Sequence, residues 1–231
     1  MEQLTMKVIA HIENDYTAKF AIPRQSGLVE GVVSTIVFEP EYRKENAFRG
    51  LEGYSHLWLL WIFSKAIREG WSPTVLPPRL GGKTRMGVFA TRSPFRPNPV
   101  GLSSVRLLGV DLRTARGPVL RVAGADLMDG TPIVDIKPYL AYTDSHPDAL
   151  GGFSDPVRDY RLEVVFPPAL LQQVPERLRQ SVLEILAQDP RPSYQHDPER
   201  VYGAAFGGWD FRFQVRDGVL TVVEVEKLRQ D

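Results

Sequence analysis

Two arginines stand on a short connector that is rich in proline. The stretch GVFATRSPFRPNPVGLS, residues 87–103, contains Arg92 and Arg96. Its prolines are Pro94, Pro97 and Pro99. Because proline fixes a backbone dihedral, the connector should present its guanidinium groups in a preset direction, which suits paired recognition of carboxylate or phosphate oxygens. A structural interpretation also stands, in which the prolines only stiffen the chain and Arg92 pairs with Asp126 or Asp129.

A second group of residues that could do chemistry is acidic. The stretch DLMDGTPIVDIKPY, residues 126–139, has three carboxylates within ten positions, and its Asp-Gly and Thr-Pro pairs predict a turn. We therefore expect Asp126 and Asp129 on a loop at the end of a strand. Such carboxylates either accept hydrogen bonds from the turn backbone or face a cationic or donor-rich ligand, and the residues alone leave both interpretations open.

Charge is unevenly distributed along a chain that has 28 basic and 28 acidic residues. Residues 70–110 contain no Asp or Glu, where the average composition would give about five. The same window holds Arg79, Lys83, Arg85, Arg92, Arg96 and Arg106. This pattern is typical of a surface that binds a polyanion. The alternative is a solvated loop face whose counter-charges come from residues 126–163, which hold eight acids and three bases.

Several common kinds of site lack their sequence pattern. RLGGKT at 79–84 lacks the first glycine of a phosphate-binding loop, where Pro77 stands, and no G-x-G-x-x-G follows a strand. The chain has no cysteine, which removes disulfides, thiolate sites and a cysteine nucleophile and fits a reducing compartment. Its four histidines are scattered, so we expect no metal. With no signal-peptide pattern and no long apolar run, we expect a soluble cytoplasmic protein without a membrane partner.

Short strand-like segments dominate the first two-thirds of the chain. They are rich in β-branched and aromatic residues and are separated by Gly, Pro, Asn and Asp. The segments are 7–12, 31–39, 56–63, 86–90, 102–110, 118–125 and 132–136. Long crossover helices do not alternate with them, which disfavours a doubly wound parallel sheet and favours a closed or nearly closed barrel. Residues 41–53 predict only a short helical turn.

A polar, Pro- and Gly-rich stretch at 143–156 predicts a domain boundary. Beyond it we expect a strand at 160–166, a helix between Pro175 and Pro190, and a hairpin at 210–226 turning at Asp217-Gly218. The predicted fold class is thus mainly β with an α+β C-terminal part. A barrel domain at 1–150 precedes a small strand–helix–hairpin domain at 157–231, which should dock on the barrel or on a partner subunit.

Six stretches together resemble the TrmO/TsaA-like family. They are FAIPRQSGL (20–28), RGLEGYSHLW (49–58), PPRLGG (77–82), MGVFATRSPFRPNPVGLS (86–103), DLMDGTPIVDIKPY (126–139) and LAQDPRPSY (186–194). The resemblance covers nearly the whole chain. It implies a non-Rossmann β-barrel methyltransferase that uses S-adenosyl-L-methionine. The implied substrate is N6-threonylcarbamoyladenosine (t6A) beside the tRNA anticodon, methylated on N6 to give m6t6A. The cofactor is expected near a homodimer interface.

The same resemblance implies a set of cofactor contacts. These are Pro23, Arg24, Gln25, Arg92, Leu102, Asp126, Leu127, Met128 and Asp129. After the apolar strand the family carries His-Gln where this chain has Ser64-Lys65. Contacts at Ser64 and Lys65 therefore either run through the backbone or differ from those of the family.

The catalytic residue is not identified by the sequence. The receiving nitrogen is conjugated, so loss of its proton needs assistance, and Asp126, Asp129 and His56 are all candidates for the base. We expect the 70–110 surface to contact tRNA phosphates, with Arg191 contributing from the second domain. Two other functions remain: an RNA-binding barrel without catalysis, and a small-ligand barrel or hydrolase, for which no nucleophile constellation is visible.

Overall fold

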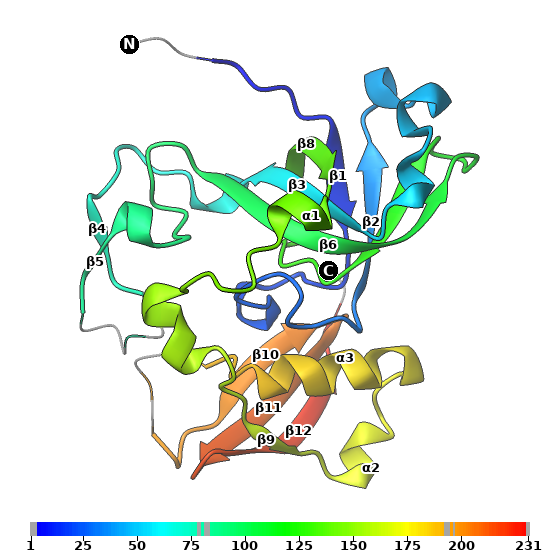
Figure 1. Cartoon of the computed structure of the whole chain (residues 1–231). Helices are drawn as coiled ribbons and strands as arrows, with labels where there is room; N and C mark the ends of the chain where they lie inside the picture. Colours follow the sequence, from blue (N-terminus) through cyan, green and yellow to red (C-terminus); the bar gives the residue numbers. More distant parts are fainter. Residues whose placement is uncertain (1–3, 78–79, 81–83, 192–194, 196, 230–231) are drawn as a thin grey trace.

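The computed structural model describes residues 4–77, 80, 84–191, 195 and 197–229. A β-barrel forms one end of the molecule and a smaller sheet, crossed by a helix, forms the other (Figure 1). The dark-blue N-terminal segment that follows β1 lies between them (Figure 1). Among the described residues, no helix combines the length and apolar character needed to cross a bilayer.

Within the described part of the chain, six strands close into a barrel in the order β1-β2-β7-β6-β3-β8. Their bounds are β1 (Ala10–Glu13), β2 (Val33–Phe38), β3 (His56–Ile62), β6 (Val100–Asp111), β7 (Val119–Ala123) and β8 (Pro132–Pro138). Neighbouring strands are antiparallel throughout. The predicted mainly β, barrel-like fold is confirmed.

The barrel interior is filled by alternate residues of each strand. In β3, Leu57, Leu59 and Trp61 are buried, while the residues between them are half-buried. The outer face of β3 is apolar as well because helix α1 (Ala141–Asp144) lies against it, where Trp58 Nε1 donates to Asp144 Oδ2 at 2.8 Å. This double coverage explains why the strand reads as one continuous apolar run.

The prediction of a strand at 86–90 is wrong beyond its first two residues, Met86 and Gly87. β5 (Met86–Gly87) pairs with β4 (Thr74–Val75) in a separate small ladder, and the 3-10 turn η7 (Val88–Ala90) follows. A short apolar run does not distinguish a strand from a turn, and here Phe89 is 73% exposed. The ladder and the 3-10 turn η5 (Ser64–Ala66) belong to an excursion between β3 and β6, residues 64–99, which we call the lobe (Figure 1).

The short helical turn expected at 41–53 is present as successive 3-10 turns. These are η2 (Pro40–Tyr42), η3 (Glu45–Phe48) and η4 (Leu51–Gly53). Phe48 is buried and meets Phe38 edge to face, with ring centroids 4.7 Å apart. The turns therefore close one end of the barrel over its apolar interior.

The C-terminal unit contains the expected helix and hairpin together with a strand that the sequence analysis did not identify. Its elements are β9 (Glu163–Val165), α2 (Pro168–Leu171), α3 (Glu176–Ala187), β10 (Tyr202–Phe206), β11 (Trp209–Arg216) and β12 (Val219–Lys227). The sheet order is β10-β11-β12-β9, with β9 parallel to β12. The 3-10 turn η8 (Gly152–Val157) precedes this unit. The domain limits 1–150 and 157–231 stay a prediction.

Residues 16–32 are shared between the two units. They follow β1 and include the 3-10 turn η1 (Lys19–Ala21). Tyr16, Ala21, Val29 and Val32 are nevertheless buried in the core of the C-terminal unit, packed with residues of α3 and of the β10–β12 sheet. The segment that carries the Pro-Arg-Gln stretch thus continues from the barrel and is anchored in the apolar core of the C-terminal unit.

Gly101 tests how tightly β6 is packed. A Cβ atom there would overlap the Trp61 ring, closer than atoms can approach. We predict that Gly101→Ala lowers the free energy of unfolding by about 1–3 kcal/mol through overpacking. Gly53→Ala is the control, because nothing lies within 4 Å of the place its added Cβ would take, and it should stay within about 0.5 kcal/mol of the parent. Urea unfolding measures both, and equal stability of the two variants contradicts the packing.

Candidate functional site

Gln25 and Arg92 meet although they are far apart in the chain. Arg92 Nη1 donates to Gln25 Oε1 at 2.5 Å. Gln25 follows the buried Pro23 in the shared segment, and Arg92 follows η7 at the edge of the lobe. The connector after Arg92 is folded on itself, because Arg96 Nη1 donates to the Thr91 carbonyl at 3.2 Å. Arg92 is therefore held by its bond to Gln25 and by a connector that Arg96 folds back onto Thr91.

Asp126 lies at the end of β7, beside this pair. Its Oδ1 accepts a hydrogen bond from Ser103 Oγ at 2.5 Å, and Ser103 Oγ in turn accepts from Trp61 Nε1 at 2.9 Å. Burial raises the pKa of Asp126 above its ordinary value; bonds from Ser103 and from the Ser26 backbone, and the charge of Arg92, act in the opposite direction without cancelling it. The site thus holds a carboxylate whose charge is incompletely compensated.

The turn that carries Asp126 is fixed from the N-terminal side by Asn14. Its Nδ2 donates to the Leu127 carbonyl at 3.0 Å, and its backbone N–H donates to Asp129 Oδ1 at 3.0 Å. The Gly27 N–H donates to the Gly124 carbonyl at 2.9 Å, which ties the Pro-Arg-Gln stretch to the same turn. The turn that carries Asp126 is thus hydrogen-bonded to Asn14 on one side and to Gly27 on the other. These bonds help to bring Asp126 close to Gln25 and Arg92.

The remaining residues of the acidic stretch do different work. Leu127 is fully buried in the barrel core, so only its backbone can meet a ligand. The Met128 carbonyl accepts from Thr131 Oγ1 at 2.6 Å, which closes the turn. Asp129 is exposed and accepts a hydrogen bond from the backbone N–H of Asn14, which is distant in the chain; this contact is not the local turn bond that the structural interpretation expected. Asp126 and Asp129, three positions apart, thus have unlike environments.

Other predicted contacts lie around the same end of the barrel without joining the cluster. Leu102 is 50% exposed on the face of β6 opposite to Ser103, since neighbouring side chains alternate. Ser64 and Lys65 are exposed on η5, directly after β3 and next to the Phe63 N–H to Pro99 carbonyl bond of 2.9 Å. Arg24 Nη2 donates to the Asp189 carbonyl at 3.2 Å, on the C-terminal unit. Which of these residues bind a cofactor stays a prediction.

The three candidates for a catalytic base are separated by the fold. His56 pairs with Arg106 on β6, four residues from Leu102, which places it roughly 13 Å along the strand. Its Nδ1 lies 3.0 Å from Ser55 Oγ. Asp129 Oδ1 already accepts a hydrogen bond from the backbone N–H of Asn14. Asp126 is the candidate that lies with Gln25 and Arg92.

The sequence analysis did not identify Ser103 and Asn14, which hydrogen-bond Asp126 and the turn that carries it. Ser103 is buried and bridges Trp61 to Asp126. A small polar residue at an inward position of an apolar strand was a usable signal for it. Asn14, next to the predicted strand 7–12, carried no such signal, because Asn at a strand end is ordinary turn chemistry. No cluster of three or more His, Asp or Glu side chains that could hold a metal ion occurs among the described residues.

Known proteins match this chain over nearly its whole length. The family model for the tRNA-methyltransferase O N-terminal domain matches residues 11–145, and that for the TrmO C-terminal domain matches residues 159–228. A tRNA (adenine(37)-N6)-methyltransferase from Escherichia coli K12 is 41% identical over 234 residues, covering 98% of this chain and 99% of the relative. A Pseudomonas aeruginosa protein named as a putative S-adenosylmethionine-dependent methyltransferase, RcsF, is 42% identical over 210 residues, 87% of each chain.

A solved structure shows the same fold. The crystal structure of TrmO from Pseudomonas aeruginosa superposes with a TM-score of 0.77 at 33% identity, and covers 98% of each chain. The resemblance found in the six sequence stretches is therefore confirmed over both units. This chain belongs to the TrmO family of tRNA methyltransferases.

Proposed function

We propose that this chain transfers a methyl group from S-adenosyl-L-methionine to N6 of t6A at position 37 of tRNA, giving m6t6A. The observation that carries the proposal is the meeting of Gln25, Arg92 and Asp126 in a chain of this family. The names of relatives support position 37 and the methyl donor, since the Escherichia coli relative is a tRNA (adenine(37)-N6)-methyltransferase and an Archaeoglobus fulgidus relative is a probable S-adenosyl-L-methionine-binding protein.

The donor set at the site fits this cofactor. The cofactor has an anionic carboxylate, a cationic amine and sulfonium, and an adenine ring. A guanidinium group matches the carboxylate, and Asp126, whose buried charge is incompletely compensated, matches a cationic group. When bound, the cofactor supplies an electrophilic methyl group on sulfur. We propose Pro23, Arg24, Gln25, Ser64, Lys65, Leu102, Leu127, Met128 and Asp129 as further contacts, the buried Leu127 through its backbone.

Methyl transfer depends on alignment more than on a nucleophilic side chain. The role of the protein residues is to hold two reactants in line and to accept the proton that N6 loses. Asp126 is the best-placed acceptor of the three candidates, because it lies with Arg92 and Gln25.

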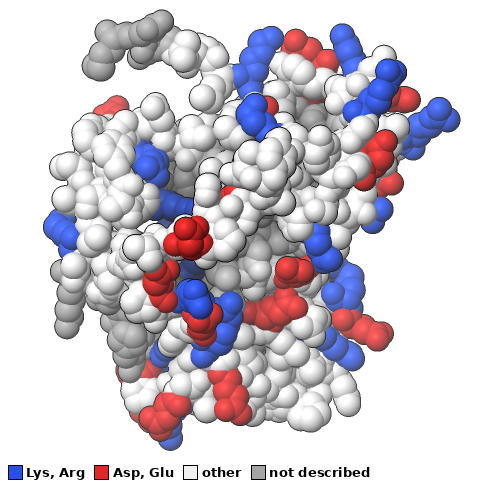
Figure 2. Space-filling model, in the orientation of Figure 1, with Lys and Arg blue, Asp and Glu red and all other residues white. Residues whose placement is uncertain are grey.

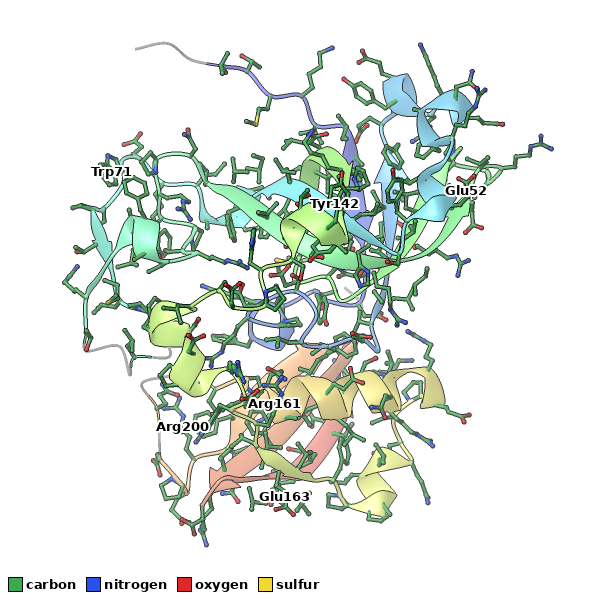
Figure 3. The ribbon with its side chains drawn as sticks, in the orientation of Figure 1. Glu52, Trp71, Tyr142, Arg161, Glu163 and Arg200 are labelled. Atoms are coloured by element: carbon green, nitrogen blue, oxygen red, sulfur yellow. The ribbon has the colours of Figure 1, made fainter. Side chains whose placement is uncertain are left out.

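The lobe offers a surface suited to tRNA. Trp71 and Phe89 are 50% and 73% exposed and lie with ring centroids 6.1 Å apart at an interplanar angle of 30°. Trp71 stands at the outer edge of the lobe (Figure 3). The face of the lobe visible in Figure 2 is mainly white, with blue patches and a red patch at its upper edge. Exposed aromatic rings beside cations are the usual means of binding unpaired bases and the phosphates between them.

We further propose a cytoplasmic homodimer that needs no metal. Leu102, half exposed beside the site, supports a second copy of the chain covering this end of the barrel. The expected contribution of Arg191 to tRNA binding fits the structure poorly, because the Arg191 side chain is only 8% exposed and is paired with Asp189. Arg79 and Lys83 lie outside the described residues.

Nucleoside analysis tests the activity. We predict that the protein, with S-adenosyl-L-methionine, adds one methyl group to t6A in tRNA, and that Arg92→Ala lowers the rate by about two orders of magnitude because alignment is lost. Arg116→Ala, which removes an exposed ion pair with Glu13 on the barrel, is the matched control and should act like the parent. Mass spectrometry of digested tRNA measures the product.

The substrate arms separate the alternatives. Methylation of tRNA that lacks the threonylcarbamoyl group overturns the t6A assignment and leaves a tRNA methyltransferase. Binding of tRNA without any methyl incorporation favours the non-catalytic RNA-binding barrel instead.

Asp126 makes a prediction about pH. Its folded-state pKa is raised, so the charge that forms as pH rises destabilises the fold, and this loss is absent in Asp126→Asn. The melting temperature of the variant minus that of the parent should therefore increase from about pH 4 to pH 8. At the same time the melting-temperature rise caused by saturating cofactor should shrink in the variant. A difference that is constant with pH contradicts the raised pKa.

The lobe makes a prediction about RNA affinity. Trp71→Ala and Phe89→Ala should each weaken tRNA binding by about 1–3 kcal/mol if a base stacks there. Arg85→Gln should reduce the slope of log affinity against log salt by about 0.7–0.9, because one phosphate contact is lost. Tyr142→Ala, an 83% exposed aromatic on α1, is the control. Filter binding at several salt concentrations measures all four variants, and parent-like affinity and salt dependence in all three lobe variants remove the lobe from the interface.

A further inference from the structure

The residues on either side of Gln25 are hydrogen-bonded to both units. On one side, Arg24 Nη2 donates to the Asp189 carbonyl of the C-terminal unit at 3.2 Å. On the other side, the Gly27 N–H donates to the Gly124 carbonyl of the barrel at 2.9 Å. Gln25 lies between these anchors and accepts the hydrogen bond of Arg92. Its position therefore depends on where the Asp189 carbonyl is held.

The turn at Asp189 is unusually constrained for the end of a helix. Asp189 follows α3 with a left-handed φ of 55°, a conformation that normally favours glycine. Its carboxylate accepts from Arg191 Nε at 2.8 Å, from Arg191 Nη2 at 2.9 Å and from Tyr160 Oη at 2.9 Å. The side chains of Asp189 and Arg191 are only 11% and 8% exposed. We call Tyr160, Asp189 and Arg191 the clamp.

The clamp contains an ion pair, Asp189 with Arg191, that is largely shielded from water. Burial acts to raise the pKa of Asp189, but the bonds and charge of Arg191 outweigh it and hold this pKa below its ordinary value. A buried ion pair is weak support for stability, because removing two charges from water offsets their attraction. In some proteins such a pair specifies one geometry, and here its bonds hold the turn that carries the Asp189 carbonyl.

We propose that Asp189, Arg191 and Tyr160 are positioning residues for the cofactor site, acting through Arg24 and Gln25 on Arg92. The inference rests on the proposed cofactor site and assigns the C-terminal unit a part in it. Arg24 then serves as the link between the units. Arg191, which the charge pattern suggested for phosphate binding, has its fork engaged by Asp189 and acts inside the protein.

General attachment of the two units does not need the clamp. Glu184 Oε2 on α3 accepts from the Glu30 and Gly31 N–H groups at 3.0 Å, and Arg177 Nη1 pairs with Asp15 Oδ2 at 2.9 Å. These contacts join the same two units at other places. A structural staple and a positioning device can therefore be told apart by comparing variants of Arg191 and Arg177.

A double-mutant cycle tests the proposal. The dissociation constant of S-adenosyl-L-methionine is measured by calorimetry on the full chain for the parent, Arg191→Met, Arg24→Met and the double variant, all shown to be folded. We expect Arg191→Met to weaken binding about tenfold in the parent and by less than about twofold in the Arg24→Met background, because both act on one link. The KM for the cofactor should rise with kcat little changed.

Tyr160→Phe provides a second variant that leaves no charge unpaired. It removes one bond to Asp189 Oδ2 and should weaken cofactor binding about two- to threefold, again only when Arg24 is present. Arg177→Met is the matched control: under the proposal it leaves cofactor affinity at the parent value, whatever it does to the melting temperature.

The outcomes are distinct. Additive losses in the cycle, or parent-like affinity in folded Arg191→Met and Tyr160→Phe, overturn the positioning role. A parent protein that binds no S-adenosyl-L-methionine overturns the proposed function instead.

Discussion

The partial withdrawal of one carboxylate, that of Asp126, from water constrains much of the surrounding structure. Burial raises the pKa of Asp126, and the groups that offset this come from Ser103, Ser26 and Arg92. Ser103 faces Asp126 because β6 and β7 are neighbours in the barrel, Ser26 because the shared segment returns to the end of β7, and Arg92 because the lobe folds back. Three separate elements, β6, the shared segment and the lobe, thus stabilise the charge of Asp126 only in part. Ionisable groups with shifted pKa values are common at functional sites, where a ligand can complete the stabilisation.

The seam between the two units is where these pieces meet. Residues 16–32 continue the chain from barrel strand β1 and pack in the core of the C-terminal unit, so that core is incomplete without them. A segment fixed in this way moves little relative to either body. The loop that carries Arg24 and Gln25 therefore gains a precision that a free surface loop lacks.

Environment, not residue type, separates the roles of like residues in this chain. Asp126 and Asp129 come from one turn, yet Asp126 is half-buried beside Arg92, whereas the exposed Asp129 accepts a hydrogen bond from the Asn14 backbone. Arg92 and Arg191 were both expected to meet anions. Arg92 bonds a neutral glutamine and keeps part of its surface exposed, whereas Arg191 is enclosed with Asp189. Burial and hydrogen-bond partners thus decide which charges remain able to bind something else.

The sequence by itself determined the barrel class, the C-terminal helix and hairpin, and the family, because alternation, helical spacing, turn pairs and motif blocks are local signals. It also singled out Arg92 and Asp126, which the structure brings close to each other. Only the tertiary structure decided that 88–90 is a turn, that β10 completes the second sheet, and that His56 lies four residues along the β3–β6 ladder from the Leu60–Leu102 pair. Ser103, Asn14 and the link from Arg24 to Asp189 join residues up to 165 positions apart. Such contacts depend on strand order and on the docking of the two units, which no local pattern encodes.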